Sequence, residues 1–448
     1  MPPQKSSITP YIIAGVIIFI IVGVGVFIMM RRGSTTTTTP TTDATDSSFT
    51  PFGRIPAPST GTGNGNALAN STSTQGITSA VAKLRLLSNT PVGGYGASTT
   101  ASTTIVRWVD RGRGNVYEAH GDSSTIVTLS NTLVPKVYNS IWNKKLTAFV
   151  GQTLESSSAS VTTLFAELRA RVSPATSKTA TSTKSASTTI ASQAPGTSIV
   201  VDTLLTPYEL KGQNLPSNII AYALSPKGDR IFMLSNNGGR GVGYIAAVNG
   251  KTVTQIFDTP VTRVTVEWPE ENTIAITTDA SAIQNGFLYF VNPKTGIWTK
   301  VLGPTLGLAT RVSHDAKYVL ASTGGQGSVT VSIYDVTKKT SIDAVIRTMA
   351  DKCVWGNFNN VMIYCAVPSQ LANGYYPDDW YSGVMNGADK IWQLNASTGE
   401  IHQVTSIVDQ SDRVIDAFNL GLDPKDEYLY FMNKNDLSLW SFDLVTSN

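Results

Sequence analysis

Polar turns followed by short apolar runs recur throughout residues 80–448, and their spacing is regular. Two of the clearest begin at Ser225 (SPKGD before RIFML) and at Asp423 (DPKDE before YLYFM). Turns of this kind begin at residues 99, 143, 225, 268, 313, 357 and 423, which are separated by 44, 82, 43, 45, 44 and 66 residues. Apolar residues alternate with polar ones in the runs, which is typical of half-buried β-strands. The pattern therefore predicts seven repeated units rich in β-structure.

Each unit contains further strand-like segments beyond the one that follows the marker turn. A third segment ends in a tight turn, as in YIAAVNGK, LYFVNPKTG and IWQLNASTG, and a fourth follows it. Four short antiparallel strands with a period of 40–45 residues are the signature of a β-propeller blade. The two long intervals contain additional loops, namely the Ser/Thr-rich tract 173–197, expected to be a disordered insertion, and a polar, aromatic loop around 368–387.

The last unit ends without a fourth strand, because the chain stops at Asn448 soon after LWSFDL. The segment Ala82–Ser88 has strand character and precedes the first unit. We therefore expect this N-terminal segment to supply the outer strand of the seventh blade, since an open ring would leave an unpaired sheet edge. The prediction for residues 80–448 is an all-β, seven-bladed propeller closed by an N-terminal strand.

The turn S-P-x-G-x before an apolar strand, and the ending of the third strand in Asp or Asn, resemble the blades of WD40-like and TolB-like propellers. The resemblance covers about residues 80–448, and the layout is similar to that of uncharacterised membrane-anchored bacterial propeller proteins. The Gly-His and Trp-Asp pairs of true WD40 repeats are missing. The resemblance implies the protein-docking role that is usual in that family, and this role is an expectation from the resemblance alone.

The segment Tyr11–Met30 contains twenty residues and no charge. As a helix it matches the roughly 30 Å hydrocarbon layer, and it predicts a transmembrane helix over residues 11–30 after a short cytoplasmic tail, residues 1–10. The alternative is a cleaved signal, but the apolar run leads into Arg31 and Arg32 instead of a small-residue cleavage site. The flanking positive charges are balanced and do not decide the orientation.

Residues 31–79 are expected to form a disordered linker. Ser and Thr make up 21 of the 47 residues from 33 to 79. Such a segment cannot bury enough apolar surface to offset its ordering entropy. A Ser/Thr-rich linker and a possible disulfide both suit the outside of a cell. The predicted location is the cell membrane, with a single span and the propeller extracytoplasmic.

Composition excludes several other functions. The chain has 34 Lys and Arg against 31 Asp and Glu, a formal charge of +3 that does not indicate a nucleic-acid partner. With three His and two Cys, a multi-His or multi-Cys zinc site is excluded by counting. We expect no metal and no cofactor.

The two cysteines are candidates for a disulfide. Cys353 and Cys365 flank the polar turn at 357–360, and a hairpin centred on Asn359 would place them opposite each other. Opposed residues on neighbouring strands come within disulfide reach. The alternative is a pair of free buried thiols, which would suit a cytoplasmic domain.

The segment 374–383 contains more aromatic residues than a blade needs. If it is a recognition loop, its candidate binding residues are Tyr375, Tyr376, Asp378, Asp379, Trp380 and Tyr381. If it is a lid, the aromatics instead fold back onto the blade and the two Asp residues build turns. Adjacent Asp residues are a weak basis for a glycosidase pair.

No catalytic motif stands out in the sequence. A G-x-S-x-G nucleophile motif is missing, and the Gly-rich segment 238–243 precedes a strand and not the helix that a phosphate site needs. We therefore expect a binding or scaffold module for a protein or glycan of the cell envelope, or a structural subunit of an envelope assembly. The alternative is a propeller hydrolase or lyase whose acids, spread over several blades, converge at the central channel and act on envelope polymers.

Overall fold

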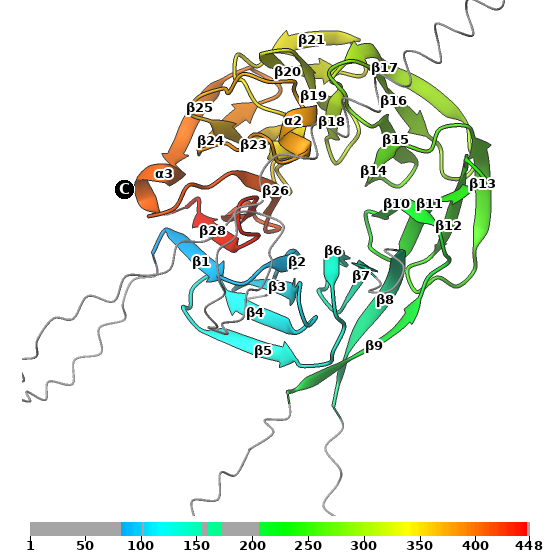
Figure 1. Ribbon diagram of the computed structural model, residues 1–448, viewed down its shortest axis with the longest axis vertical. Helices are drawn as coiled ribbons and strands as arrows, with labels where there is room; N and C mark the ends of the chain where they lie inside the picture. Colours follow the sequence, from blue (N-terminus) through cyan, green and yellow to red (C-terminus); the bar gives the residue numbers. More distant parts are fainter. Residues whose placement is uncertain (1–81, 101–102, 155–159, 172–205, 446–448) are drawn as a thin grey trace, which may run out of the picture. The chain divides into compact units, whose positions relative to one another are not determined.

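Seven four-stranded antiparallel sheets are arranged as the blades of a ring (Figure 1). The computed structural model describes residues 82–100, 103–154, 160–171 and 206–445. The first strand of each sheet lies nearest the centre of the ring, and the fourth lies at its periphery. The described part of the chain is therefore a seven-bladed β-propeller, as the repeat predicts.

Each blade runs from an inner to an outer strand. Blades one to three are β2(Val92–Thr99)-β3(Thr104–Asp110)-β4(Val116–His120)-β5(Ile126–Ser130), β6(Val137–Trp142)-β7(Ala148–Leu154)-β8(Val161–Ala170)-β9(Tyr208–Asn214) and β10(Ile219–Leu224)-β11(Arg230–Asn237)-β12(Arg240–Ala247)-β13(Thr254–Thr259). Blades four and five are β14(Val264–Glu270)-β15(Thr273–Thr278)-β16(Asn285–Val291)-β17(Trp298–Leu306) and β18(Ala309–Val312)-β19(Tyr318–Gly325)-β20(Ser328–Asp335)-β21(Thr340–Asp343). Blades six and seven are β22(Cys353–Trp355)-β23(Met362–Pro368)-β24(Asp389–Asn395)-β25(Ile401–Ser406) and β26(Ala417–Leu422)-β27(Tyr428–Asn433)-β28(Leu439–Asp443)-β1(Leu84–Ser88).

In four of the seven marker turns, one side chain closes the turn in the same way. Oγ of Ser225 accepts a hydrogen bond from the backbone N–H of Arg230 at 3.0 Å, five residues further on. Ser313, Asp423 and Asn143 accept from the N–H five residues later in the same manner, at 2.9, 2.7 and 3.2 Å. Ser, Asp and Asn share a short polar side chain that can bond nearby backbone groups. This contact explains why the sequence repeat is visible at all.

The ring is closed by the N-terminal strand. β1 pairs with β28 in antiparallel register, with Leu84 opposite Phe442 and Leu86 opposite Trp440. The first described strand of the chain thus completes the seventh sheet, which confirms the closure expected from the missing fourth strand. Closure of this kind removes the exposed edge that blade seven would otherwise present.

The hydrophobic core lies between neighbouring blades. One cluster joins Val109 and Val116 of blade one to Phe149 and Leu168 of blade two. Six of the eight Trp side chains are buried, and five of these belong to strands: Trp108, Trp142, Trp268, Trp355 and Trp440. The sixth buried Trp, Trp380, lies in the connection between β23 and β24.

The predicted transmembrane segment 11–30, the linker 31–79 and the tract 173–197 lie outside the described residues. Within the described ranges no helix is long and apolar enough to cross a membrane. The helices there are short: η1(Ala350–Lys352), α2(Asp378–Tyr381) and α3(Ile407–Gln410).

Candidate functional site

Among the connections between strands of one blade that lie wholly within the described residues, the longest joins β23 to β24, residues 369–388, which we call the blade-six loop. It contains α2 and lies on the face formed by the connections between second and third strands, which we call the 2–3 face. Asp378 accepts hydrogen bonds from Oγ of Ser281 (3.0 Å) and the N–H of Ala282 (2.6 Å), both in blade four. The N–H of Tyr376 donates to the carbonyl of Gly325 in blade five at 3.0 Å. The loop therefore reaches beyond its own blade to blades five and four.

Two aromatic side chains fasten this loop to the ring. Trp380 and Tyr376 are 7% and 6% exposed. They belong to a hydrophobic cluster that also contains Val329, Met349 and Met385. The hydroxyl of Tyr376 donates to the carbonyl of Ala372 at 2.9 Å, which satisfies its polar end. Trp380 and Tyr376 thus adopt the fold-back arrangement that was one of the two expectations for this segment.

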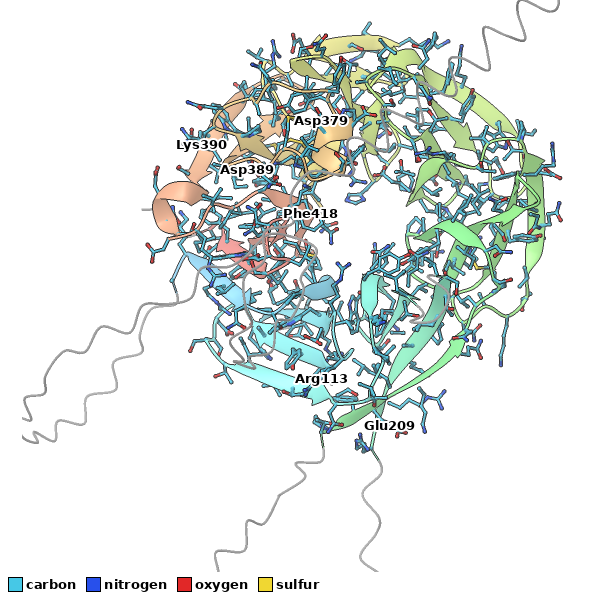
Figure 2. All side chains as sticks on the ribbon, viewed as in Figure 1. Arg113, Glu209, Asp379, Asp389, Lys390 and Phe418 are labelled. Carbon is cyan, nitrogen blue, oxygen red and sulfur yellow. A yellow bond between two sulfur atoms is a disulfide. The ribbon has the colours of Figure 1, made fainter. Side chains whose placement is uncertain are left out.

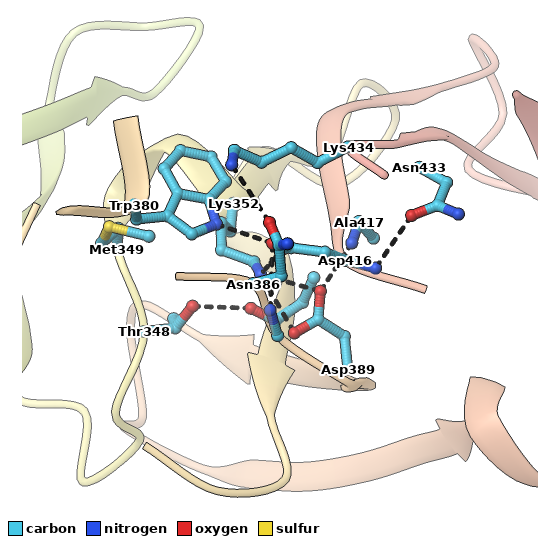
Figure 3. Close-up of polar contacts among 12 residues, drawn as sticks. Thr348, Met349, Lys352, Trp380, Asn386, Asp389, Asp416, Ala417, Asn433 and Lys434 are labelled. Atoms are coloured by element: carbon cyan, nitrogen blue, oxygen red, sulfur yellow. Dashed lines mark hydrogen bonds and ion pairs between the residues drawn. The ribbon is translucent and has the colours of Figure 1, made fainter. Parts of the chain in front are cut away.

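Below Trp380 lies a cluster of three buried charged residues, which we call the Lys352 cluster (Figure 3). Lys352 is 1% exposed, and Asp389 and Asp416 are fully buried. Nζ of Lys352 lies 2.8 Å from Oδ2 and 3.0 Å from Oδ1 of Asp389, and 2.5 Å from Oδ1 of Asp416. These residues come from η1, from the first position of β24 and from the residue before β26, so the cluster joins the inner parts of blades six and seven.

The loop is bonded directly to this cluster. Nε1 of Trp380 and the N–H of Gly387 donate to Oδ2 of Asp416 at 2.9 and 3.0 Å. The Trp380 ring also lies between two ammonium groups, with Nζ of Lys352 and Lys434 at 5.4 and 5.1 Å from its centroid. Both distances are within the range of cation–π attraction. Trp380 therefore connects the loop to blades six and seven through hydrogen bonds and ring contacts together.

Burial and the neighbouring charges shift the pKa values of Lys352 and Asp389 in opposite directions. Burial raises the pKa of Asp389 to about 6, although the nearby Lys352 ammonium lowers it. Burial lowers the pKa of Lys352, but the charges of Asp389 and Asp416 outweigh this effect and leave its pKa raised. The net shift keeps Lys352 as an ammonium between two buried Asp side chains, where solvent screening is weak.

A second polar chain begins at Tyr381 of the blade-six loop. The hydroxyl of Tyr381 donates to Oδ2 of Asp351 at 2.5 Å, and the other oxygen of Asp351 lies 3.7 Å from the Arg311 guanidinium. Arg311 pairs in turn with Glu267 at 2.8 Å. Burial lowers the pKa of Arg311, but Glu267 and Asp351 more than compensate and raise it. The guanidinium of Arg311 thus pairs with the carboxylates of both Glu267 and Asp351.

The predicted site residues divide into a supporting group and an exposed group. Asp378 and Asp379 build the loop, because Asp378 bonds blade four and Oδ2 of Asp379 accepts the N–H of Tyr375 at 2.8 Å. Trp380 and Tyr376 are buried anchors, whereas Tyr375 and Tyr381 are 45% and 46% exposed. The six residues do come together in one loop, but their side chains do not all face the same way.

The exposed aromatics have apolar neighbours on the same loop and at its contact with blade four. Val384, three residues after Tyr381, is 75% exposed. Ile283, the residue after Ala282, is 76% exposed. We call Ile283, Tyr375, Tyr381 and Val384 the exposed apolar set. Exposed apolar side chains on a rigid support can form an interaction surface.

The sequence pattern did not indicate the Lys352 cluster. In the sequence these three charged residues lie far apart, two of them beside a residue of opposite charge, and each is placed just before or at the start of an apolar segment. A charge at such a position most often faces solvent, so the pattern contains no signal for burial.

Cys353 and Cys365 are opposite each other in the pairing of β22 with β23 and form a disulfide. Both residues are buried, at 3% and 0% exposure. The bond joins the first two strands of the same blade that bears the long loop. In the described ranges, no group of three or more His, Cys, Asp or Glu residues is suited to hold a metal ion.

No protein-family model matches this sequence, and no curated protein matches it. Among solved structures, an oligogalacturonate lyase in complex with manganese is 9% identical, with a TM-score of 0.45, and covers 81% of this chain and 98% of its own. TolB from Acinetobacter baumannii is 9% identical, with a TM-score of 0.39 and 79% of each chain covered. The propeller domain of the Trilobed protease from Pyrococcus furiosus is 10% identical, with a TM-score of 0.46, and covers 78% of this chain and 94% of its own.

At TM-scores below 0.5 these likenesses carry no argument about function. The propeller class rests on the strand pairing itself, with seven sheets of four strands and closure through β1.

Proposed function

We propose that this protein is a single-pass membrane protein that holds its propeller outside the cytoplasm and binds a partner protein of the cell envelope through the 2–3 face. The observation that carries the proposal is the exposed apolar set, Ile283, Tyr375, Tyr381 and Val384, displayed on or beside a loop that is fastened to four blades. Aromatic side chains on a pre-organised support contribute binding energy at low entropic cost.

A protein partner fits this surface better than a glycan. Sugar sites combine a stacking aromatic ring with carboxylates or amides that are open to the sugar hydroxyls. Here the carboxylates of Asp378 and Asp379 accept hydrogen bonds from the loop and from blade four. The exposed side chains that remain are two Tyr rings and two aliphatic groups, a composition close to that of protein interfaces.

The membrane part of the proposal rests on the sequence. Residues 11–30 form an uncharged apolar segment of spanning length, and residues 31–79 resemble a tether between a membrane and a folded domain. A disulfide inside blade six is consistent with an oxidising compartment. The partner is accordingly expected among envelope proteins and not among cytoplasmic ones.

The test is photo-crosslinking in living cells. A photo-reactive amino acid at position 384 should yield a discrete crosslinked protein of higher mass. The matched control is position 358, because Phe358 is 81% exposed but lies between β22 and β23. That connection is at the opposite end of β23, on the opposite face of the ring. Equal crosslinking from both positions, or none from 384, would contradict the proposed surface, and retention on envelope glycan alone would favour a glycan partner.

A further inference from the structure

Figure 3 shows an amine and a carboxyl group held in contact in the dry interior of the protein. Nζ of Lys352 touches both oxygens of Asp389, at 2.8 and 3.0 Å, although the two residues are 37 positions apart in the chain. Asp389 is fully buried and Lys352 is 1% exposed. Two reactants fixed at this distance experience a very high effective concentration of each other.

The surrounding groups are arranged differently on the two oxygens of Asp389. The N–H of Ala417 donates to Oδ2 at 2.6 Å, in a position to stabilise negative charge on that oxygen. No such donor besides Lys352 is present for Oδ1 among the described residues. These contacts suit Oδ2 to remain as the carbonyl oxygen of an amide and Oδ1 to depart as the leaving group.

Asp416 is placed where a proton shuttle would be needed. Its Oδ2 is occupied by Nε1 of Trp380 and the N–H of Gly387. Its Oδ1 contacts Nζ of Lys352 at 2.5 Å. A carboxylate fixed by one oxygen, with the other directed at the amine, can accept a proton from the nitrogen and return it to a leaving oxygen.

We propose that Lys352 and Asp389 are joined by an intramolecular amide bond between Nζ and Cγ, formed autocatalytically with Asp416 as the proton-transferring residue. The proposal concerns a covalent modification of the blade and is independent of the partner-binding function.

The reaction is balanced without any other reactant. The Lys352 ammonium passes one proton to the Asp389 carboxylate, and the neutral amine attacks Cγ while Oδ2 is stabilised by the Ala417 N–H. Asp416 removes a second proton from the nitrogen and delivers it to the departing Oδ1, which leaves as water when the Cγ–Oδ1 bond breaks. One C–N bond forms, one C–O bond breaks, no group is oxidised or reduced, and Asp416 ends as a carboxylate.

Burial favours both the start and the end of this reaction. Burial acts to lower the pKa of Lys352 and to raise the pKa of Asp389, so it reduces the free energy needed to move a proton from the amine to the carboxyl group, against the attraction of the two Asp side chains for the ammonium. A cavity of about 20 Å³ adjoins the site, lined by Lys352, Trp380 and Gly387 among others. That volume holds one water molecule, the size of the product that must depart. Lys352 and Asp389 are buried, and this burial limits the access of bulk water to the finished amide.

The neighbouring residue in the chain supports the same interpretation. Cys353 already joins β22 to β23 through its disulfide with Cys365. An amide from Lys352 to Asp389 would join the start of β22 to the start of β24, so that two covalent links from adjacent residues would hold the first three strands of blade six. Asp389 also begins directly after the blade-six loop, and the amide would therefore fix the end of that loop.

The test is mass spectrometry of the full-length, reduced and alkylated protein after digestion with trypsin. Unlinked protein yields the separate peptides 348–352 and 353–390, because cleavage follows Arg347, Lys352 and Lys390. Linked protein resists cleavage after Lys352 and yields one species, 348–390. Its mass is lower than that of the unlinked, uncleaved peptide 348–390 by one water molecule. Recovery of the two separate peptides as the main products would overturn the proposal, and so would a link from Lys352 to Asp416.

Two variants test whether Asp416 transfers protons or only supports the structure around Lys352. Asp416→Asn keeps the shape of the side chain but removes its basicity, and the bond should form at least about 100-fold more slowly. Asp351→Asn is the matched control, because the carboxylate of Asp351 contacts Tyr381 and Arg311 whereas the Lys352 amine pairs with Asp389 and Asp416, and the bond should form as in the unaltered protein. Full linkage in Asp416→Asn would contradict the shuttle role. Since the unaltered protein alone decides whether the bond exists, a poorly folding variant does not affect that answer.

Discussion

Nε1 of Trp380 donates a hydrogen bond to Oδ2 of Asp416 across 2.9 Å, between residues that are 36 positions apart. Trp380 belongs to the loop of blade six, and Asp416 immediately precedes the inner strand of blade seven. This contact makes the loop part of the ring instead of an appendage on it. Figure 2 places the labelled Asp379 and Asp389 on the same side of the ring as Phe418 of β26, which agrees with that connection. The anchored loop and the closed ring both have consequences that can be measured.

Replacing Trp380 with Ala should lower the free energy of unfolding by about 3–5 kcal/mol, the usual loss for a buried aromatic side chain. The change removes the indole from its cluster with Val329, Met349 and Met385 and leaves Oδ2 of Asp416 without one of its donors. Urea unfolding of the isolated propeller measures the effect. Tyr375→Ala is the control, since its ring is 45% exposed, and it should lose roughly 1 kcal/mol or less. Equal losses in the two variants would mean that Trp380 does not anchor the loop.

Substitution of exposed side chains on the loop should weaken partner binding without lowering stability. A double variant Tyr381→Ser, Val384→Ser should abolish crosslinking from a probe at position 283 while leaving the melting temperature within a few degrees, because neither side chain is buried. Phe358→Ser on the opposite face should leave crosslinking unchanged. If the double variant is stable and still crosslinks fully, these two side chains do not form the recognition surface.

Removing the closing strand should destabilise the whole ring. Deletion of residues 82–88 takes away β1 and the partners of Phe442, Ser441 and Trp440 in blade seven. The unpaired β28 then exposes a strand edge, and its buried residues lose their cover. We expect a lower melting temperature in a single cooperative transition, together with a greater tendency to aggregate. A deletion variant that melts at the original temperature would show that closure through β1 contributes little.

The disulfide should stabilise the protein by a modest amount. Cys353 and Cys365 are separated by 12 residues, and a loop of that size corresponds to about 3 kcal/mol in the chain-entropy treatment. The double variant Cys353→Ser, Cys365→Ser should therefore unfold at lower urea concentration than the oxidised protein. The fully reduced protein serves as the control and should match the variant approximately. No difference between oxidised and reduced protein would indicate that the bond is absent in solution.

Membrane topology can be tested by protease added to intact cells. Cleavage within residues 31–79 should release a soluble fragment that contains the propeller, because the proposed orientation places this linker outside. Cells opened before treatment provide the reference digestion. A fragment that appears only after the cells are opened would place the propeller in the cytoplasm.

Much of the architecture was predictable because it depends on short-range patterns. The turns at Ser225, Ser313 and Asp423 are closed by side chains that bond five residues further along, so a similar local sequence recurs in several blades. Four strands per repeat, seven repeats and a missing last strand then imply a closed ring. The pairing of Cys353 with Cys365 likewise follows from a hairpin, in which opposed positions can be counted from the turn.

The candidate site could be predicted only in part, because its contacts are long-range. The aromatic content of residues 374–383 indicated that the segment is unusual, but the direction of each ring depends on which neighbouring blades provide a pocket. Trp380 is buried because Met349 and Asp416 lie beneath it, whereas Tyr381, one residue later, remains half exposed. No local pattern distinguishes these two positions.

By itself, then, the sequence determined the number of blades, the closing strand and the opposed cysteines, all of which depend on periodicity and on residues close in the chain. The tertiary structure alone decided that Lys352, Asp389 and Asp416 form one buried cluster and that the blade-six loop crosses to blades four and five. The physical reason is that a charged side chain can be buried only where partners from distant segments replace its hydration, and those partners are defined by how blades six and seven pack.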